Sequence, residues 1–198
     1  MVHVVLNTQR QQINPSFLIN EDIFDHRYDM DYTSTHYKDY KEKRGQKDYY
    51  FPFGWKRNLK DYFHYYQGDD LNWLTMDNHD DEWSVAYHGT KLKFVVSIIM
   101  DSSGHPNLRP GRRQAYAEYK NQNPRSDTFQ QKCENGVYCT PKIEIAEGYT
   151  TPVPYDGKKY KIAFQCRINP RKFRNAGDDN YITNSEDIRP YGILLKAE

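Results

Sequence analysis

The chain is 198 residues long, a length that suits one compact domain, or one domain with an N-terminal extension. Only 37% of its residues are hydrophobic, but 18 tyrosines can fill a core while their hydroxyl groups stay hydrogen-bonded. A formal net charge of +1 argues against nucleic acid as a bulk electrostatic partner, although local basic pairs remain available for a small anionic ligand.

Residues 1–82 form a polar region that is rich in tyrosine. Half of the tyrosines lie between Tyr28 and Tyr66, and the segment from Lys56 to Tyr66 has an amphipathic pattern. A run rich in Asp, Asn and His, from Asp77 to Asp81, then predicts a hinge before the next strand. We expect residues 1–82 to pack beside a second region, residues 83–198, and their pattern alone assigns them no role.

The second region begins with a predicted strand from Trp83 and a helix. Thr90 is a good N-cap, and the apolar residues after it repeat at helical spacing: Leu92, Val95, Val96 and Ile99. Residues 105–134 are loop-like, and residues 136–140 read as a strand. Thr140-Pro141 then predicts the start of a short helix that runs through Tyr149.

The last part of the chain is predicted to be mostly strand. Residues 160–168 alternate between apolar and polar side chains, which indicates a strand with one buried face. Residues 181–183 and 192–195 predict two more strands. Short strands interrupted by two helices indicate an α+β domain with mostly antiparallel pairing.

Two local patterns in residues 83–149 suit the binding of a flat, amide-bearing ligand. A strand that ends in His88-Gly89 offers an imidazole for a hydroxyl group, and a backbone that a carboxamide can approach closely. Tyr138 at the end of a strand and Tyr149 on the next helix can sandwich a ring between them. Ala146 lies three residues before Tyr149 and therefore on the same helical face.

The joint spacing of His88-Gly89-Thr90, Gly136-x-Tyr138, Ala146 and Tyr149 resembles the NAD-binding core of the ADP-ribosyltransferases of the poly(ADP-ribose) polymerase type. The resemblance covers about residues 83–198. It implies a fold of split antiparallel sheets with short helices. It also implies an enzyme that cleaves the nicotinamide–ribose bond of NAD, its co-substrate, and transfers ADP-ribose to a macromolecular acceptor.

The resemblance also implies a role for each matching residue. His88 orients the adenosine-side ribose, Gly89 holds the carboxamide with Thr90 beside it, and the rings of Tyr138 and Tyr149 stack on nicotinamide. Ala146 stands where the family commonly has serine. One lost hydrogen bond of this kind is worth about 0.5–1.5 kcal/mol, so nicotinamide binding should weaken rather than vanish.

The family's third catalytic position is acidic, and here the register places Asp179 in it, which completes a catalytic set with His88 and Tyr149. A slip of one residue would place Asn180 there, Asp178 is also near, and a solvated turn is the plain alternative. An aspartate in place of the family's glutamate favours the transfer of a single ADP-ribose unit or a loss of activity.

The loop between Leu108 and Cys133 occupies the place of the family's lid over NAD. Its Arg112, with Arg109 and Arg113 nearby, carries a guanidinium group of the right shape to pair with the pyrophosphate. Charged residues on loops are more often simply solvated, which is the alternative for each of these arginines.

Three other functions compete with the transferase. The missing serine and glutamate suggest a catalytically weak or inactive module that binds NAD, ADP-ribose or a protein. A relative of the NAD-using RNA 2′-phosphotransferases would share the fold, but the chain lacks a general basic surface. Cys139 could serve as a nucleophile with a histidine, although no spacing identifies its base.

Composition also bounds the partners and the compartment. Three cysteines without C-x-x-C spacing and the absence of an H-E-x-x-H motif lead us to expect no metal and no disulfide framework. No apolar run approaches membrane-spanning length, so we expect a soluble protein of the cytoplasm or nucleus, with no membrane partner. A protein acceptor is favoured over a nucleic acid acceptor.

Overall fold

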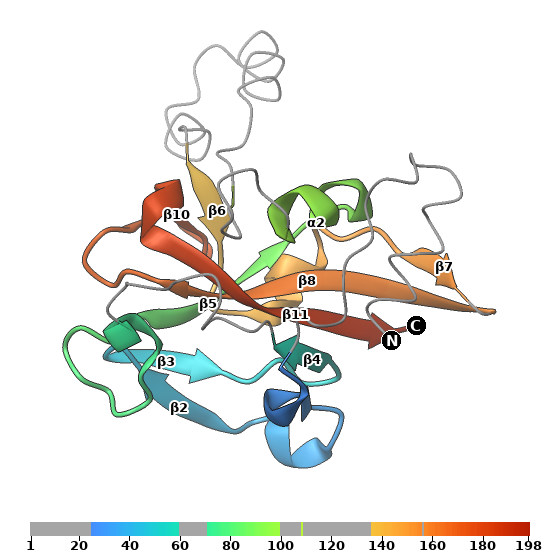
Figure 1. The fold of residues 1–198 in the computed structure, drawn as a ribbon, viewed down its shortest axis with the longest axis horizontal. Coiled ribbons are helices and arrows are strands. Elements are labelled where there is room, and N and C mark those ends of the chain that lie inside the picture. Colours follow the sequence, from blue (N-terminus) through green and yellow to red (C-terminus); the bar gives the residue numbers. More distant parts are fainter. Residues whose placement is uncertain (1–24, 60–70, 100–107, 109–135, 156) are drawn as a thin grey trace, which may run out of the picture.

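The computed structural model describes residues 25–59, 71–99, 108, 136–155 and 157–198. Its largest element is a six-stranded sheet in which every pair of neighbours is antiparallel (Figure 1). The strands follow one another in the order β1 (Met30–Asp31), β4 (Lys56–Leu59), β11 (Ile188–Ala197), β8 (Lys158–Ile168) and β5 (Ser84–Gly89), and β7 (Val153–Tyr155) pairs with β8.

Two smaller sheets and a few short helices complete the described fold. One sheet has the order β6 (Val137–Cys139), β10 (Tyr181–Thr183) and β9 (Arg174–Asn175), and the other is the hairpin of β2 (Lys41–Arg44) and β3 (Lys47–Tyr50). The helices are α2 (Leu92–Ile99), α5 (Ile143–Glu147) and the 3-10 turns η3 (His26–Tyr28), η4 (Thr35–Tyr37), η5 (Leu71–Leu74) and η6 (Ser185–Asp187). The predicted α+β class with mostly antiparallel pairing is confirmed.

One face of the six-stranded sheet carries the larger core. The alternating apolar residues of β8 point into it, as their spacing predicts: Ile162, Phe164, Cys166 and Ile168. Three buried residues of α2 pack against them: Val95, Ile98 and Ile99. Figure 1 shows α2 lying over the sheet on this side. The packing of α2 therefore anchors the segment that follows β5 on this face of the sheet.

The prediction that β8 has a single buried face was incomplete, because its other face is buried as well. Gln165 is fully buried there, donates from Nε2 to the Tyr49 hydroxyl at 2.8 Å and accepts from Arg57 Nη1 at 3.2 Å. Both partners come from the N-terminal region. This region also contributes β1 and β4 to the main sheet. The first residues of the amphipathic segment noted from Lys56 to Tyr66 form strand β4, and the rest of that segment lies outside the described residues.

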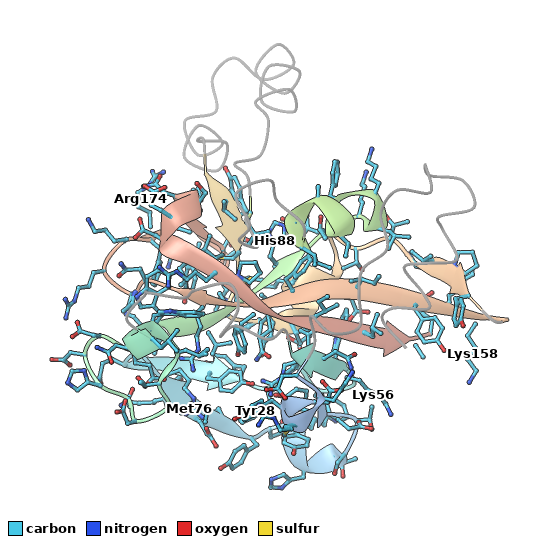
Figure 2. All side chains as sticks on the ribbon, in the orientation of Figure 1. Tyr28, Lys56, Met76, His88, Lys158 and Arg174 are labelled. Atoms are coloured by element: carbon cyan, nitrogen blue, oxygen red, sulfur yellow. The ribbon has the colours of Figure 1, made fainter. Side chains whose placement is uncertain are left out.

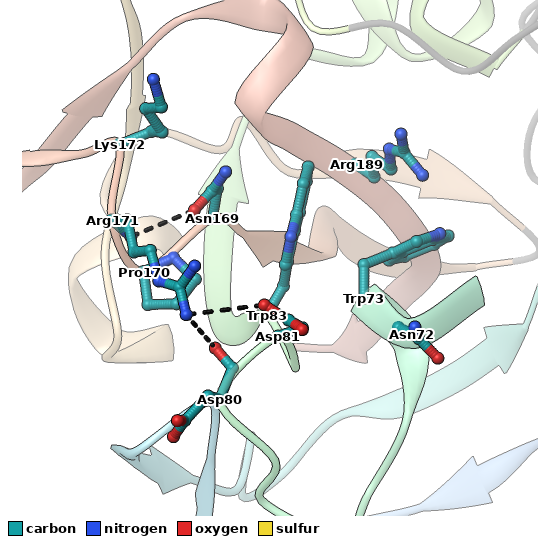
Figure 3. Close-up of a pocket in the computed structure, with 10 residues that line it drawn as sticks. All are labelled: Asn72, Trp73, Asp80, Asp81, Trp83, Asn169, Pro170, Arg171, Lys172 and Arg189. Carbon is teal, nitrogen blue, oxygen red and sulfur yellow. Dashed lines mark hydrogen bonds and ion pairs between the residues drawn. The ribbon is translucent and has the colours of Figure 1, made fainter. Parts of the chain in front are cut away.

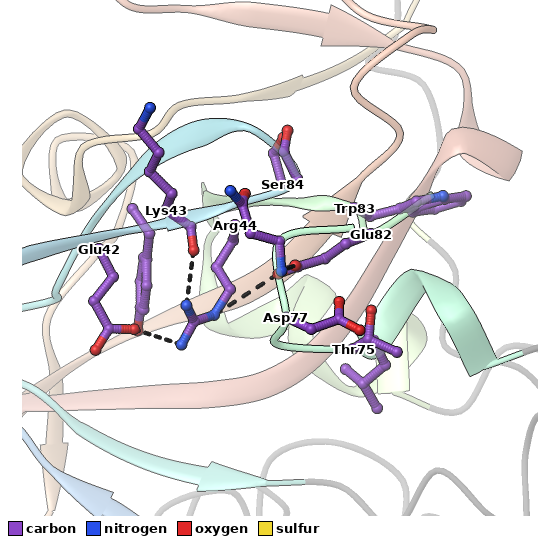
Figure 4. A network of polar contacts seen from close by, with 12 residues as sticks. Glu42, Lys43, Arg44, Thr75, Asp77, Glu82, Trp83 and Ser84 are labelled. Carbon is purple, nitrogen blue, oxygen red and sulfur yellow. Dashed lines mark hydrogen bonds and ion pairs between the residues drawn. The ribbon is translucent and has the colours of Figure 1, made fainter. Parts of the chain in front are cut away.

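A buried ion pair joins Glu82, which precedes β5, to β8, and Arg44 of the N-terminal hairpin lies next to it. Glu82, which has no exposed surface, binds Arg167 of β8, with Oε1 and Nη1 3.0 Å apart. Arg44 of β2 approaches the same carboxylate at 3.8 Å and also contacts Glu42 at 2.5 Å (Figure 4). Because burial of an unpaired charge is costly, this network makes the hairpin part of the same packed unit as β8.

Candidate functional site

The end of β5 lies directly beside β6. The two strands meet at an isolated antiparallel bridge, in which the Tyr87 N–H donates to the Thr140 carbonyl at 2.7 Å and the Thr140 N–H donates back at 3.0 Å. One residue further along β5, His88 Nδ1 lies 2.8 Å from the carbonyl oxygen of Tyr138. Figure 2 shows His88 between β6 and α2. The structure therefore brings together two residues that the sequence placed in one site.

The hydrogen bond of His88 fixes the form of its imidazole. A carbonyl oxygen only accepts, so Nδ1 carries the proton and Nε2 is left as an acceptor. Burial lowers the pKa of His88 below its ordinary value of 6.5, and the hydrogen bond to Tyr138 opposes this only in part. The ring is therefore neutral at neutral pH and can accept a hydrogen bond from a hydroxyl group.

The lowered pKa of His88 makes the free energy of unfolding depend on pH. Below pH 6.5 the unfolded chain binds a proton at this residue before the folded protein does, so the folded state loses stability as the pH falls. We expect His88→Asn to flatten this decline when urea midpoints are measured between pH 7.5 and 5.5. His36→Asn, on an exposed surface, is the matched control. Equal slopes in the wild type and His88→Asn would contradict this expectation.

Gly89 lies against the helix that follows β6. A Cβ atom at this position would lie 1.8 Å from the Ala146 carbonyl oxygen and 3.1 Å from Tyr149 Cβ, so a glycine is required. Ala146 is buried in this contact, and Thr90 is buried two residues before α2 begins. Gly89, Ala146 and Tyr149 are thus adjacent in space as well as regularly spaced in sequence.

The helix α5 is shorter at both ends than predicted. Thr140 is held in the bridge to Tyr87, so it stays extended, and its Oγ1 accepts from the Lys142 N–H at 3.2 Å. Helical residues therefore begin only at Ile143, with Lys142 as the N-cap. Tyr149 follows the last helical residue by two positions, in a turn where its N–H donates to the Ala146 carbonyl at 3.0 Å, and 62% of its surface is exposed.

Tyr138 is half-buried in the middle of β6. Its neighbours Val137 and Cys139 point into the core, so its side chain points to the opposite face of the strand. Gly136 has a packing role next to it, since a Cβ atom there would lie 2.4 Å from Ile182 Cγ2 of β10. The spacing Gly-x-Tyr therefore reflects close contact between β6 and β10 as well as the position of Tyr138.

The acidic candidates lie in the turn between β9 and β10. Asp178 and Asp179 both have left-handed backbone conformations, with φ of 51° and 56°. Asn180 stabilises this turn by donating from Nδ2 to the Asp178 carbonyl at 3.1 Å. The carboxylate of Asp179 lies 2.7 Å from Lys142 Nζ and raises the pKa of that lysine. Asp179 is thereby tied to the segment that joins Tyr138 to α5.

Several other predicted groups can be placed or set aside. Arg109, Arg112 and Arg113 lie outside the described residues. Cys139 is buried, and this burial raises the pKa of its thiol far above the ordinary range, which argues against a Cys–His nucleophile. Within the described ranges there is no group of three or more His, Cys, Asp or Glu that could hold a metal ion, and no helix there is long and apolar enough to cross a membrane.

A cavity of about 330 Å³ lies away from the group around His88 (Figure 3). Its lining comes from three separate segments: Asn72, Trp73, Asp80, Asp81 and Trp83; Asn169, Pro170, Arg171 and Lys172; and Arg189. Sequence reasoning missed this cavity because no motif joins segments so far apart. The tryptophans of the first segment and the basic residues of the other two were the only available signal.

No protein-family model matches the chain, and no curated protein matches it. A function is therefore inferred from the residues and their geometry.

Proposed function

We propose that the protein is an NAD-dependent ADP-ribosyltransferase that transfers a single ADP-ribose unit to a macromolecular acceptor, on the split-sheet fold of the poly(ADP-ribose) polymerase type. The observation that carries the proposal is the contact of His88 with the Tyr138 backbone, together with the packing of Gly89 on Ala146 and Tyr149. These residues come from three elements, β5, β6 and the segment of α5. Their proximity supports a common ligand site.

In this proposal, each side chain has one task. The unprotonated Nε2 of His88 accepts a hydrogen bond from a ribose hydroxyl, and the rings of Tyr138 and Tyr149 stack on nicotinamide. The exposure of Tyr149 leaves its ring available to a ligand. Two further residues complete the wall of the site, namely Ala146 and Thr90, which follows Gly89. In this proposal Arg112 binds the pyrophosphate.

The reaction would break the bond between the nicotinamide nitrogen and C1′ of the ribose, and the electron pair leaves with nicotinamide. The acceptor nucleophile then forms a bond to C1′ and loses its proton. The positive charge that develops on the ribose needs a nearby anion, a role that we assign to the carboxylate of Asp179. Lys142, 2.7 Å from that carboxylate, would set its position. A protein side chain is the acceptor that we favour over a nucleic acid end.

The test is transfer of label from NAD to proteins of a lysate, with release of nicotinamide measured in parallel. We expect His88→Ala to lower kcat/KM by about 10- to 100-fold, because it removes a hydrogen bond in a buried site. His36→Ala, at an exposed histidine, should leave kcat/KM unchanged. The proposal fails if the wild type releases no nicotinamide, or if the two histidine variants behave alike.

A second candidate is a module on the same fold that binds NAD or ADP-ribose without turnover. The ion pair of Asp179 with Lys142 favours it, because the carboxylate is already engaged by a cation. Calorimetry with a non-hydrolysable NAD analogue distinguishes the two. Tight binding with no turnover supports the module, whereas turnover that is lost in Asp179→Ala supports the transferase.

A further inference from the structure

The cavity of about 330 Å³ lies at the other end of β5 from His88. Trp83, which lines it, immediately precedes β5, whereas His88 and Gly89 end that strand. A strand rises about 3.3 Å per residue, so the two ends are separated by about 16 Å. None of the residues around His88 lines the cavity. A ligand bound here would therefore be distinct from NAD in the proposed transferase site.

Two tryptophans give the cavity a rigid aromatic wall. The guanidinium carbon of Arg189 lies 4.9 Å from the ring centre of Trp73 and 5.0 Å from that of Trp83. Trp73 is buried, while Trp83 is half-buried and lies at the centre of the lining residues in Figure 3. Nucleobases stack on aromatic side chains such as the indole ring, and any of the bases can do so because each has a flat π-face.

Basic side chains surround the same cavity. Arg171 and Lys172 follow β8 in an exposed turn, and Arg171 makes two long contacts, to the Asp80 carbonyl at 3.4 Å and to Asp81 Oδ1 at 3.5 Å. Lys172 is exposed and forms no ion pair with any residue in the described ranges. Such weak, solvent-exposed contacts can be exchanged for stronger bonds to a phosphate group.

The size and charge of the cavity narrow the class of ligand. Three cationic residues, Arg171, Lys172 and Arg189, face two acidic ones, Asp80 and Asp81, so the lining favours an anion. A volume of about 330 Å³ lies at the lower end of ligand pockets, which span roughly 300–1,000 Å³. Carboxylates at the rim can accept hydrogen bonds from the amino groups of a base.

We propose that this cavity binds a phosphorylated nucleoside, with its base against Trp83 and its phosphate between Arg171 and Lys172. The ligand is either a free mononucleotide or the phosphorylated end of a single-stranded nucleic acid, which present the same chemistry. The cavity shares no residue with the site around His88, so this inference stands independently of the proposed function.

The experiment is calorimetric titration of the full chain with 5′-AMP, 5′-GMP, 5′-CMP and 5′-UMP, with inorganic phosphate and the four nucleosides for comparison. We expect at least one monophosphate to bind about tenfold more tightly than its nucleoside or phosphate, and to quench tryptophan fluorescence. A short 5′-phosphorylated oligonucleotide distinguishes the sources. Tighter binding than the mononucleotide identifies a nucleic acid end, and equal or weaker binding identifies the free nucleotide.

Charge-reversal variants assign the binding to this cavity. Lys172→Glu should weaken the affinity for the monophosphate by about tenfold or more. Lys158→Glu, at an exposed lysine on the other end of β8, and His88→Ala should each change it by less than about twofold. Trp83→Leu, checked for folding by circular dichroism, should lower the affinity and reduce the quenching. The proposal is overturned if no monophosphate binds at millimolar concentration, or if His88→Ala rather than Lys172→Glu abolishes binding.

Discussion

The substitution Gly89→Ala should destabilise the protein by more than about 3 kcal/mol, at the upper end of the costs of overpacking. The added methyl group would lie 1.8 Å from the Ala146 carbonyl oxygen and 2.7 Å from the carbonyl carbon. Both are backbone atoms, so no side chain can rotate away, and α5 would have to move from the end of β5. Urea unfolding should show the loss, and heating should lower Tm by roughly 10 °C.

Gly157→Ala is the matched control for this prediction. Gly157 has φ of 72°, so the new side chain is strained, but no atom lies within 4 Å of its Cβ position. The control should therefore cost only about 1–2 kcal/mol, the penalty of a left-handed conformation alone. Equal losses of stability in the two variants would show that contact with Ala146 is not what requires glycine at residue 89.

The strands and the motifs of the site could be predicted from the sequence because their signals are local. The alternation of apolar residues along β8 predicts which side chains face the α2 side of the sheet. The strand that ends in His88-Gly89 lies where the pattern placed it. The strand that carries Tyr138 does so too, although Tyr138 lies in the middle of that strand and not at its end. An antiparallel bridge next to the two motifs brings them together in space. From the sequence alone, only their spacing along the chain was known.

The second face of β8 could not be predicted in the same way. Gln165 and Arg167 are polar, so the alternation assigned them to solvent, yet both are buried. Their partners, Tyr49 and Glu82, come from the N-terminal region, more than 80 positions earlier in the chain. A polar residue in a strand is predicted to be exposed unless the distant segment that supplies its hydrogen-bond partner is known.

The predicted ends of α5 were wrong, and the register of the acidic position stayed open in the sequence, for a related reason. Thr140 and Pro141 are good helix-start residues, but the bridge to Tyr87 holds Thr140 in an extended conformation and delays the helix. Similarly, the three candidates for the acidic position are consecutive in the chain: Asp178, Asp179 and Asn180. The direction of each side chain depends on the conformation of the turn that contains them, which the sequence does not specify. Tertiary contacts outweighed local preference in both places.

The substitution Arg167→Met should cost about 3–5 kcal/mol in the free energy of unfolding, because it leaves the Glu82 carboxylate buried without its principal cation. Glu82 has no exposed surface, so water cannot replace the lost hydrogen bonds. Arg167 also donates to the carbonyls of Trp83 at 2.6 Å and Thr75 at 2.9 Å, which would lose these donors. Urea unfolding of the wild type and of Arg167→Met measures this difference in the free energy of unfolding.

The exposed pair of Lys56 with Asp31 provides the comparison. Its atoms lie 2.7 Å apart, closer than the 3.0 Å of the buried pair, yet about half of each side chain is exposed. Lys56→Met should therefore cost less than about 1 kcal/mol, since water solvates the remaining carboxylate. Burial rather than distance would then account for the difference between the two variants. If Arg167→Met costs no more than Lys56→Met, burial does not make the Glu82–Arg167 pair more important for stability than an exposed pair.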